Sequence, residues 1–181
     1  QLIHCDLKPE NIVIKSYSRC EVKLIDFGSS SFITDQHSSY IQSRSYRAPE
    51  VIIGAPYDYR IDVWSYGAVL AELVTGLVLF QNDSIPMMLG RITGILGPFP
   101  ENVLRAGKET PAFFTAGNIV YDRIGPKTAS GPGSGNGHRR HGWDRVRPID
   151  DDETLVLIYP KKTTLAARMH FEDCTEKSDE G

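Results

Sequence analysis

The sequence predicts an α+β fold that is mostly helical and carries one short β hairpin near its start. Two β-branched runs, at residues 12–14 and 22–25, flank a polar turn at 16–19, which is the usual pattern of a hairpin. Apolar side chains then recur at helical spacing over residues 58–77, and a second helix is expected over residues 84–96. Helices together with a small antiparallel pair of strands place the chain in the α+β class.

The ends of the two helices carry their own signals. Gly76 is the expected C-terminal cap of the first helix, because glycine readily takes the left-handed conformation that ends many helices. Ser84 is the expected N-cap of the second helix, and Gly97 its stop. Gly90 and Gly94 weaken this second prediction, since glycine costs about 1 kcal/mol relative to alanine inside a helix. The first helix is apolar on more than one face, which predicts that it is buried inside a larger domain.

Composition bounds the possible partners. The 181 residues are 40% apolar and 24% charged, which argues against wholesale disorder and against a fibrous repeat. The formal charge is −3, so no global attraction to nucleic acid or to anionic lipid is expected. The longest apolar run, around residues 66–80, is interrupted by Glu72 and is shorter than the roughly 20 residues of a spanning helix. We therefore expect neither nucleic acid nor a membrane as a partner.

Cysteine usage indicates a compartment. Cys5, Cys20 and Cys174 are odd in number and widely spaced. This argues against a disulfide framework and fits a reducing environment. We therefore expect the protein to lie inside the cell, in the cytoplasm, the nucleus or both.

Four segments are predicted along the chain. Residues 1–121 form a partial domain, and residues 122–153 form a flexible insertion rich in glycine, proline and serine. Residues 154–171 return to domain-like sequence with a short expected strand, and residues 172–181 are a polar, disordered tail. The insertion buries little apolar surface, so we expect it to stay mobile.

Three short motifs surround the predicted hairpin. The stretch His-Cys-Asp-Leu-Lys-Pro-Glu-Asn occupies residues 4–11 just before it, and Asp-Phe-Gly at 26–28 comes just after it. Ala-Pro-Glu at residues 48–50 follows about twenty residues later. Each tripeptide alone is weak, because a turn after a strand would explain it. In this order and spacing the set is hard to obtain by accident.

This set of motifs resembles the catalytic half of the eukaryotic protein kinases. Residues 40–50 (Tyr-Ile-Gln-Ser-Arg-Ser-Tyr-Arg-Ala-Pro-Glu), Cys5 in place of the usual arginine, and the two serines after the Asp-Phe-Gly motif are similar to the dual-specificity tyrosine-regulated (DYRK-like) kinases of the CMGC group. The resemblance is strong over residues 1–105 and returns weakly at 158–165. It implies the mostly helical large, C-terminal lobe of a kinase, with the hairpin carrying the catalytic and metal loops and the small lobe absent.

The resemblance assigns the chemistry. Phosphoryl transfer needs a hydroxyl placed in line with a triphosphate and metal ions that neutralise its charge. Asp6 would accept or orient the proton of the attacking hydroxyl, and Lys8 would lie beside the transferred phosphoryl group. Asn11 and Asp26 would supply oxygens to Mg²⁺, and Lys8 and Asp26 would contact the ATP cofactor. Gly28 would permit backbone angles that a side chain forbids.

Other residues are implied as supports. Asp62 would accept hydrogen bonds from backbone amides of the catalytic loop, although a carboxylate stabilised by the helix dipole would also explain it. Ser43 would bridge the loop's lysine and aspartate, and His4 would pack beneath the Asp-Phe-Gly turn. Glu50 normally pairs with an arginine on a late helix in this family; Arg168 is conceivable as the partner, but no late-helix pattern supports it.

Specificity and regulation follow from the same resemblance. Lys8 followed by Pro-Glu is the serine/threonine type of pattern, and Arg47 resembles the arginine that favours a proline after the phosphorylated residue. Tyr40 matches the activation-loop tyrosine that these kinases phosphorylate on themselves. A phosphate there needs cationic partners, and Arg44 and Arg47 are the candidates. A solvated charge is the plain alternative for Arg44.

Two functions of different classes remain open from the sequence. The first is a serine/threonine or dual-specificity kinase that transfers the γ-phosphoryl group of ATP to protein substrates. The second is a truncated, non-catalytic interaction module, since neither a Gly-rich loop nor the usual strand lysine is present. Nucleic-acid binding through the basic residues 138–141 is a third reading, against which a solvated linker is preferred. The isolated chain is expected to be inactive and to expose apolar surface. The sequence does not indicate an oligomeric state.

Overall fold

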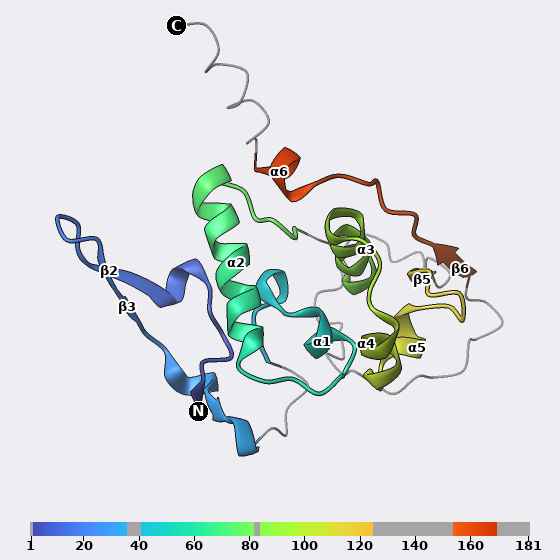
Figure 1. Cartoon of the computed structure of the whole chain (residues 1–181), viewed down its shortest axis with the longest axis horizontal. Helices are drawn as coiled ribbons and strands as arrows, with labels where there is room; N and C mark the ends of the chain where they lie inside the picture. The colour runs from blue at the N-terminus through green and yellow to red at the C-terminus, as the bar shows by residue number, and fades with distance from the viewer. Residues whose placement is uncertain (1, 36–40, 82–83, 125–153, 170–181) are drawn as a thin grey trace, which may run out of the picture.

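The computed structural model describes residues 2–35, 41–81, 84–124 and 154–169. The β2–β3 hairpin lies on one side of the long helix α2, and the smaller helices α3, α4 and α5 lie on the other (Figure 1). The strands and helices in chain order are β1 (Leu2–Ile3), β2 (Ile12–Ser16), β3 (Glu21–Leu24), β4 (Ser31–Phe32), α1 (Pro49–Ile52), α2 (Arg60–Thr75), α3 (Ile85–Leu96), α4 (Glu101–Ala106), α5 (Thr110–Phe113), β5 (Tyr121–Ile124), β6 (Thr154–Leu157) and α6 (Leu165–Arg168).

The described strands form three antiparallel pairs. β2 pairs with β3, with Ile12 opposite Leu24, so the predicted hairpin is confirmed. β1 pairs with β4, which brings the first residues of the chain beside Ser31 and Phe32, just after the Asp-Phe-Gly turn. β5 pairs with β6 and thereby joins the two ends of the predicted insertion. β5 continues to Ile124, so its last three residues, 122–124, fall inside the predicted insertion.

Helix α2 connects two apolar clusters. Ile61, near its start, packs with Ile3, Cys5 and Val51 beside the residue 4–11 loop. Further along, Ala68 and Val69 pack into the larger cluster, whose most buried members include Ile52, Ile53, Met88 and Leu89. Trp64 contacts both clusters and stacks on Phe80, with ring centroids 5.4 Å apart. The helix therefore fixes the loop relative to the helical core.

The opposite face of α2 is exposed. Val63, Leu70 and Leu73 are 42–70% exposed in the described chain, so the chain exposes apolar surface as expected, and burial of this face inside a larger domain stays a prediction. The apolar composition of the helix was correctly identified, but composition does not say what covers a face. The helix ends at Gly76 with φ of +71°, as predicted. No helix in the described ranges combines the length and apolar character needed to cross a membrane.

Helix α3 forms despite its two glycines. Ser84 caps it, its hydroxyl accepting a hydrogen bond from the Met87 amide at 3.3 Å. A Cβ at Gly90 would come within 2.8 Å of Ile158, and one at Gly94 within 2.8 Å of the Lys161 carbonyl oxygen. The glycines therefore admit residues 158–163, here called the strap, against α3.

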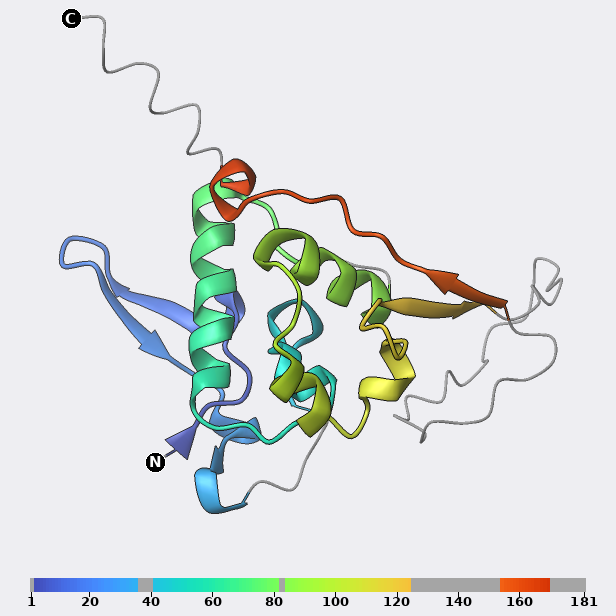
Figure 2. The same ribbon diagram turned by 45° about the vertical axis from the view of Figure 1, so that its right-hand side comes forward.

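The strap is fixed at both ends. The Ile158 amide donates to the Val120 carbonyl at 2.8 Å, and the Thr163 amide donates to the Gly94 carbonyl at 3.0 Å. Figure 2 shows the strap running from β6 across α3 to α6, which lies near the C-terminal end of α2. Residues far apart in the sequence thus meet along one helix.

Replacing Gly94 with alanine should lower the free energy of unfolding by about 1–3 kcal/mol, because the added methyl group meets the strap backbone. Gly67→Ala in α2 is the matched control, since a Cβ there meets nothing within 4 Å. Better helix propensity should raise the stability of that variant by up to about 1 kcal/mol. Urea unfolding of both variants measures the difference, and equal stabilisation by both would contradict the close contact.

Candidate active site

The carboxylate of Asp62 holds the residue 4–11 loop. Its Oδ2 accepts the amide of His4 at 2.7 Å, and its Oδ1 accepts the amide of Cys5 at 3.0 Å. Cys5 has φ of +63°, a left-handed conformation that costs a residue with a side chain about 1–3 kcal/mol. Asp62 lies in the first turn of α2, so the helix supplies the group that stabilises the strained turn.

Asp6, Lys8 and Ser43 form a hydrogen-bonded triangle. The Lys8 Nζ lies 2.8 Å from Asp6 Oδ2 and donates to the Ser43 hydroxyl at 3.2 Å. The Ser43 hydroxyl donates to Asp6 Oδ1 at 2.7 Å, and the Ser43 amide donates to the same oxygen at 3.0 Å. The serine therefore bridges the lysine and the aspartate, in the arrangement that the sequence predicts.

These contacts set the charge of the aspartate. Burial by itself raises the pKa of Asp6, but the hydrogen bonds from Lys8 and Ser43 outweigh burial and bring the pKa below its usual value. The pKa of Lys8 is raised, chiefly by its hydrogen bond to Asp6 and further by the charges of Glu10 and Asp26. Both side chains are therefore ionised at neutral pH.

Asn11 links this triangle to the end of the hairpin. Its side-chain nitrogen donates to the Asp6 carbonyl at 2.8 Å, which leaves the amide oxygen as the atom for a cation. Its backbone carbonyl accepts the Ile25 amide at 3.0 Å, and Asp26 follows directly. These bonds place Asp6, Lys8, Asn11 and Asp26 on two neighbouring turns, one before the hairpin and one after it.

The Asp-Phe-Gly turn differs from its prediction in one respect. The residue in the left-handed region is Asp26, with φ of +62°, while Gly28 does not have a positive φ. Gly28 contributes space instead, since a Cβ there would lie 3.3 Å from Asp26 Oδ1. Its missing side chain therefore leaves room for the carboxylate rather than permitting unusual backbone angles.

His4 packs beneath this turn. Its ring centroid lies 4.9 Å from that of Phe27, and its Nε2 lies 3.0 Å from the Ile25 carbonyl oxygen. Its Nδ1 accepts the Asp6 amide at 3.3 Å, so Nε2 carries the proton and donates it to Ile25. Both ring nitrogens are therefore engaged with the backbone.

Gln42 is a site residue that the sequence analysis missed. Its side chain donates to the Ile61 carbonyl at 2.9 Å and to the Ser65 hydroxyl at 2.8 Å, and accepts the Ala48 amide at 2.9 Å. Its own amide donates to the Cys5 carbonyl at 2.9 Å, and its φ is +66°. No local signal marks a glutamine in a loop for this position, because its partners come from distant elements.

The two arginines predicted to hold a phosphate have different environments. Arg47 is 5% exposed and donates from Nε to the Ile41 carbonyl at 2.8 Å and from Nη2 to the Gln42 carbonyl at 2.7 Å. Arg44 is exposed to solvent. Tyr40, the predicted phosphorylation site, lies outside the described residues. The structure therefore assigns the buried arginine to shaping the backbone before Ser43.

Glu50, on α1, is half-buried and lines a pocket together with residues of α4. Burial raises its pKa, the charge of Asp58 raises it further, and Arg60 offsets part of the rise. In the described parts of the chain no ion pair joins Glu50 to an arginine. Arg168 lines another pocket, beside α3 and the strap, and Glu50 is not among the residues of that pocket, so the described chain does not show the pairing that the sequence allowed.

The residues present fit a magnesium ion that is shared with a nucleotide. No group of three or more His, Cys, Asp or Glu side chains gathers as a metal site within the described ranges. Asp26 and Asn11 would supply two oxygens. Mg²⁺ is commonly held by one or two protein carboxylates together with substrate phosphates and water, so this pair is sufficient on the protein side.

Comparisons of the sequence with known proteins identify the family of the chain. The protein kinase domain model matches residues 1–96. The chain is 47% identical over 113 residues to the serine/threonine-protein kinase ppk5 of Schizosaccharomyces pombe, covering 62% of this chain and 14% of the relative. It is 40% identical over 158 residues to dual specificity tyrosine-phosphorylation-regulated kinase 3 of Mus musculus, covering 87% and 27%. It is 45% identical over 119 residues to the Homo sapiens protein of the same name, covering 66% and 20%. The chain thus spans 14–27% of the length of these three curated relatives.

Removing the Asp62 carboxylate should destabilise the chain by about 3 kcal/mol, because two backbone amides lose a charged acceptor and the turn at Cys5 loses its support. The variant is Asp62→Ala, measured by urea unfolding. Glu101→Ala is the control, since this carboxylate pairs with Arg105 on the surface and is 67% exposed. Exposed pairs contribute at most about 1 kcal/mol. Equal losses in the two variants would contradict the role of Asp62.

Ser43→Ala should raise the pKa of Asp6, because the hydroxyl that donates to Oδ1 is lost. A lowered carboxyl pKa stabilises the fold above the unfolded value of about 3.9, and this contribution is lost as the pH falls through the folded value. The variant therefore has a smaller Asp6 contribution to stability at neutral pH. A carbon-13 carboxyl titration by NMR measures the shift. Ser30→Ala is the control, as its hydroxyl donates to the Phe27 carbonyl, and an unmoved Asp6 titration in Ser43→Ala would contradict the assignment.

Proposed function

Because this chain belongs to the protein kinase family and resembles the dual-specificity tyrosine-phosphorylation-regulated kinases, we propose that the protein transfers the γ-phosphoryl group of ATP to serine or threonine hydroxyls of protein substrates. The observation that supports this most directly is the gathering of Asp6, Lys8, Asn11 and Asp26 on two neighbouring turns. Protein kinases as a family use ATP and Mg²⁺. The described chain corresponds in this proposal to the large lobe.

The triangle around Asp6 explains how the loop would act. Its carboxylate is ionised and held from both sides, by Lys8 on Oδ2 and by Ser43 on Oδ1. A substrate hydroxyl placed beside it would give its proton to this carboxylate as its oxygen bonds to the γ-phosphorus of ATP, while the bond from that phosphorus to the β–γ bridging oxygen breaks and ADP leaves. The Lys8 ammonium lies where negative charge develops, and such fixed charges stabilise a transition state without reorganisation. ATP with Mg²⁺ would supply the phosphoryl donor and its activation.

We also propose that the protein phosphorylates its own Tyr40. The support is its position, four residues before Arg44 in a segment similar to kinases that are named for regulation by tyrosine phosphorylation. Arg44 is exposed and would meet the phosphate, whose charge of about −1.5 to −2 suits a guanidinium group. Arg47, by contrast, already donates to two backbone carbonyls.

Those two bonds suggest a preference for proline after the phosphorylated residue. Arg47 holds the Gln42 carbonyl at 2.7 Å, so this acceptor is engaged within the protein. A substrate residue with a backbone N–H would find no partner there, and an unpaired donor is costly. Proline has no backbone N–H and avoids this cost.

The catalytic proposal is tested with the full-length protein and its Asp6→Asn and Asp26→Asn variants. Phosphate incorporation into serine and threonine peptides should fall at least about 100-fold in each variant. Asp35→Asn is the control, because Asp35 is exposed and accepts a hydrogen bond from the hydroxyl of its neighbour Thr34. Mass spectrometry of the same preparations should find phosphate on Tyr40 in the unmodified protein and none in Asp26→Asn.

The outcomes distinguish the proposed kinase from a non-catalytic interaction module. A non-catalytic interaction module would show no phosphate incorporation above background in any of the four proteins. Transfer that survives in Asp26→Asn would also contradict the proposal, since that variant removes the carboxylate for the metal.

Arg47→Ala should reduce the preference for proline over alanine after the phosphorylated residue by about tenfold, the worth of one hydrogen bond. The measure is the ratio of kcat/KM for two peptides that differ only at this position. Arg60→Ala is the control, because its guanidinium pairs on the surface with Asp58. An unchanged ratio in Arg47→Ala would show that the engaged carbonyl does not set the preference.

A further inference from the structure

A second pocket lies away from the candidate active site, between α3 and the strap. It has a volume of about 240 Å³. Met87, Ile95 and Ile158 form apolar walls, and Pro160 closes one side. Because the strap packs closely against Gly90 and Gly94, residues that are far apart in the sequence line this one pocket.

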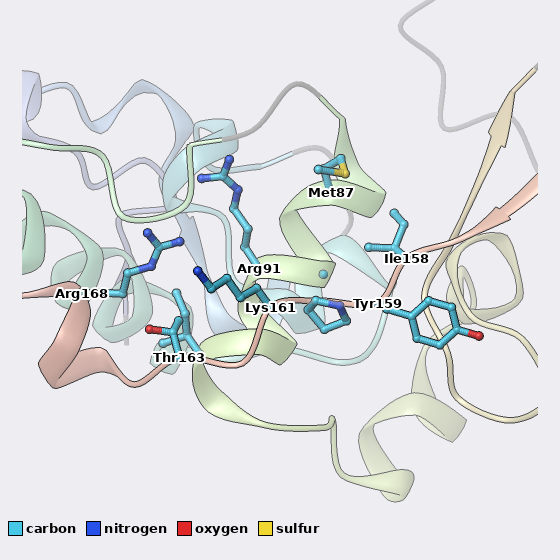
Figure 3. Close-up of a pocket in the computed structure, with 10 residues that line it drawn as sticks. Met87, Arg91, Ile158, Tyr159, Lys161, Thr163 and Arg168 are labelled. Carbon is cyan, nitrogen blue, oxygen red and sulfur yellow. The ribbon is translucent and has the colours of Figure 1, made fainter.

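Three cationic side chains converge on this pocket. Arg91 comes from α3, Lys161 from the strap and Arg168 from α6. Figure 3 shows their charged ends pointing toward one another on the same side of the strap, with the side chain of Thr163 beside them. Within the described ranges none of the three cations forms an ion pair with a carboxylate.

The three positive charges of this cluster repel one another unless an anion binds between them. Like charges held close together cost free energy, and the apolar walls reduce screening by water. The arrangement is therefore suited to a ligand that brings negative charge into a small volume.

We propose that this pocket binds the phosphate group of a phosphoserine or phosphothreonine in a segment of a partner protein. A phosphate carries about −1.5 to −2 charges and three strong acceptor oxygens, which match three cationic donors and a hydroxyl. Two guanidinium groups favour phosphate because their donors form a planar fork. The walls of Met87, Ile95 and Ile158 receive an apolar residue that neighbours the phosphorylated one.

The geometry of the pocket favours a phosphorylated peptide over nucleic acid or an anionic membrane. Nucleic acids and anionic membranes are met by extended stripes or planes of basic residues. Here the cations surround one concave site, whose volume suits a phosphate and one or two side chains. In a kinase, such a site would retain substrates that already carry a phosphate. That role depends on the proposed function, whereas the binding itself does not.

The test is fluorescence anisotropy with the full-length protein in the absence of ATP, so the result is independent of phosphoryl transfer. The probe is a fluorescein-labelled peptide with one phosphoserine between leucines, compared with matched serine and glutamate peptides. The phosphopeptide should bind at least about tenfold more tightly than either. Arg91→Gln and Arg168→Gln should each weaken its binding about tenfold.

Lys162→Gln is the matched control. Lys162 neighbours Lys161 on the strap and is exposed, but it does not line the pocket. It should leave phosphopeptide binding unchanged. Lys161→Gln is a further variant on the exposed strap and should weaken binding even if Arg91→Gln fails to fold.

Several results would overturn the proposal. Equal binding of the phosphopeptide and the glutamate peptide would do so, as would a loss in Lys162→Gln as large as in Lys161→Gln. Tighter binding of phosphatidylserine vesicles or of a single-stranded oligonucleotide would point to another class of partner. Phosphopeptide binding that appears only after Glu172→Gln and Asp173→Asn would assign the pocket to the chain's own acidic tail.

Discussion

The two backbone amides held by Asp62 are the constraint on which the candidate active site depends. Cys5, Asp26 and Gln42 all adopt left-handed conformations around this site, although each carries a side chain. Conformations of this kind persist only where the surroundings fix them. Asp62 fixes the conformation of Cys5. The amide of Gln42 donates to the Cys5 carbonyl, so Gln42 is held to the same turn. The buried start of α2 thus sets the geometry of loops that would otherwise relax.

Local chemistry allowed the framework to be predicted. The β2–β3 hairpin follows from two β-branched runs around a polar turn, and the caps at Gly76 and Ser84 follow from residue type alone. The four residues at the centre of the candidate site are predicted from motifs, whose spacing is read along the chain and needs no tertiary information. Sequence patterns are informative where the controlling contacts lie within a few residues.

Long-range contacts account for what could not be predicted. Gln42 receives its role from α2 and from the Cys5 carbonyl, and neither is near it in sequence. Gly90 and Gly94 suggested a weak helix, but their purpose is space for a strap that arrives from far along the chain. The pocket with three cations could not be predicted either, because its residues come from three separate elements.

The pairing of β5 with β6 has an evolutionary consequence. Ile124 and Thr154 are paired across the two strands, so the sequence between them begins and ends at neighbouring positions of the domain. The entropy of closing such a loop grows only logarithmically, by about 0.6 kcal/mol for each doubling of length. Lengthening or replacing that stretch therefore costs the folded domain little. Evolution can therefore insert new peptide sequence between Ile124 and Thr154 while the residue 4–11 loop and the Asp-Phe-Gly turn keep their geometry.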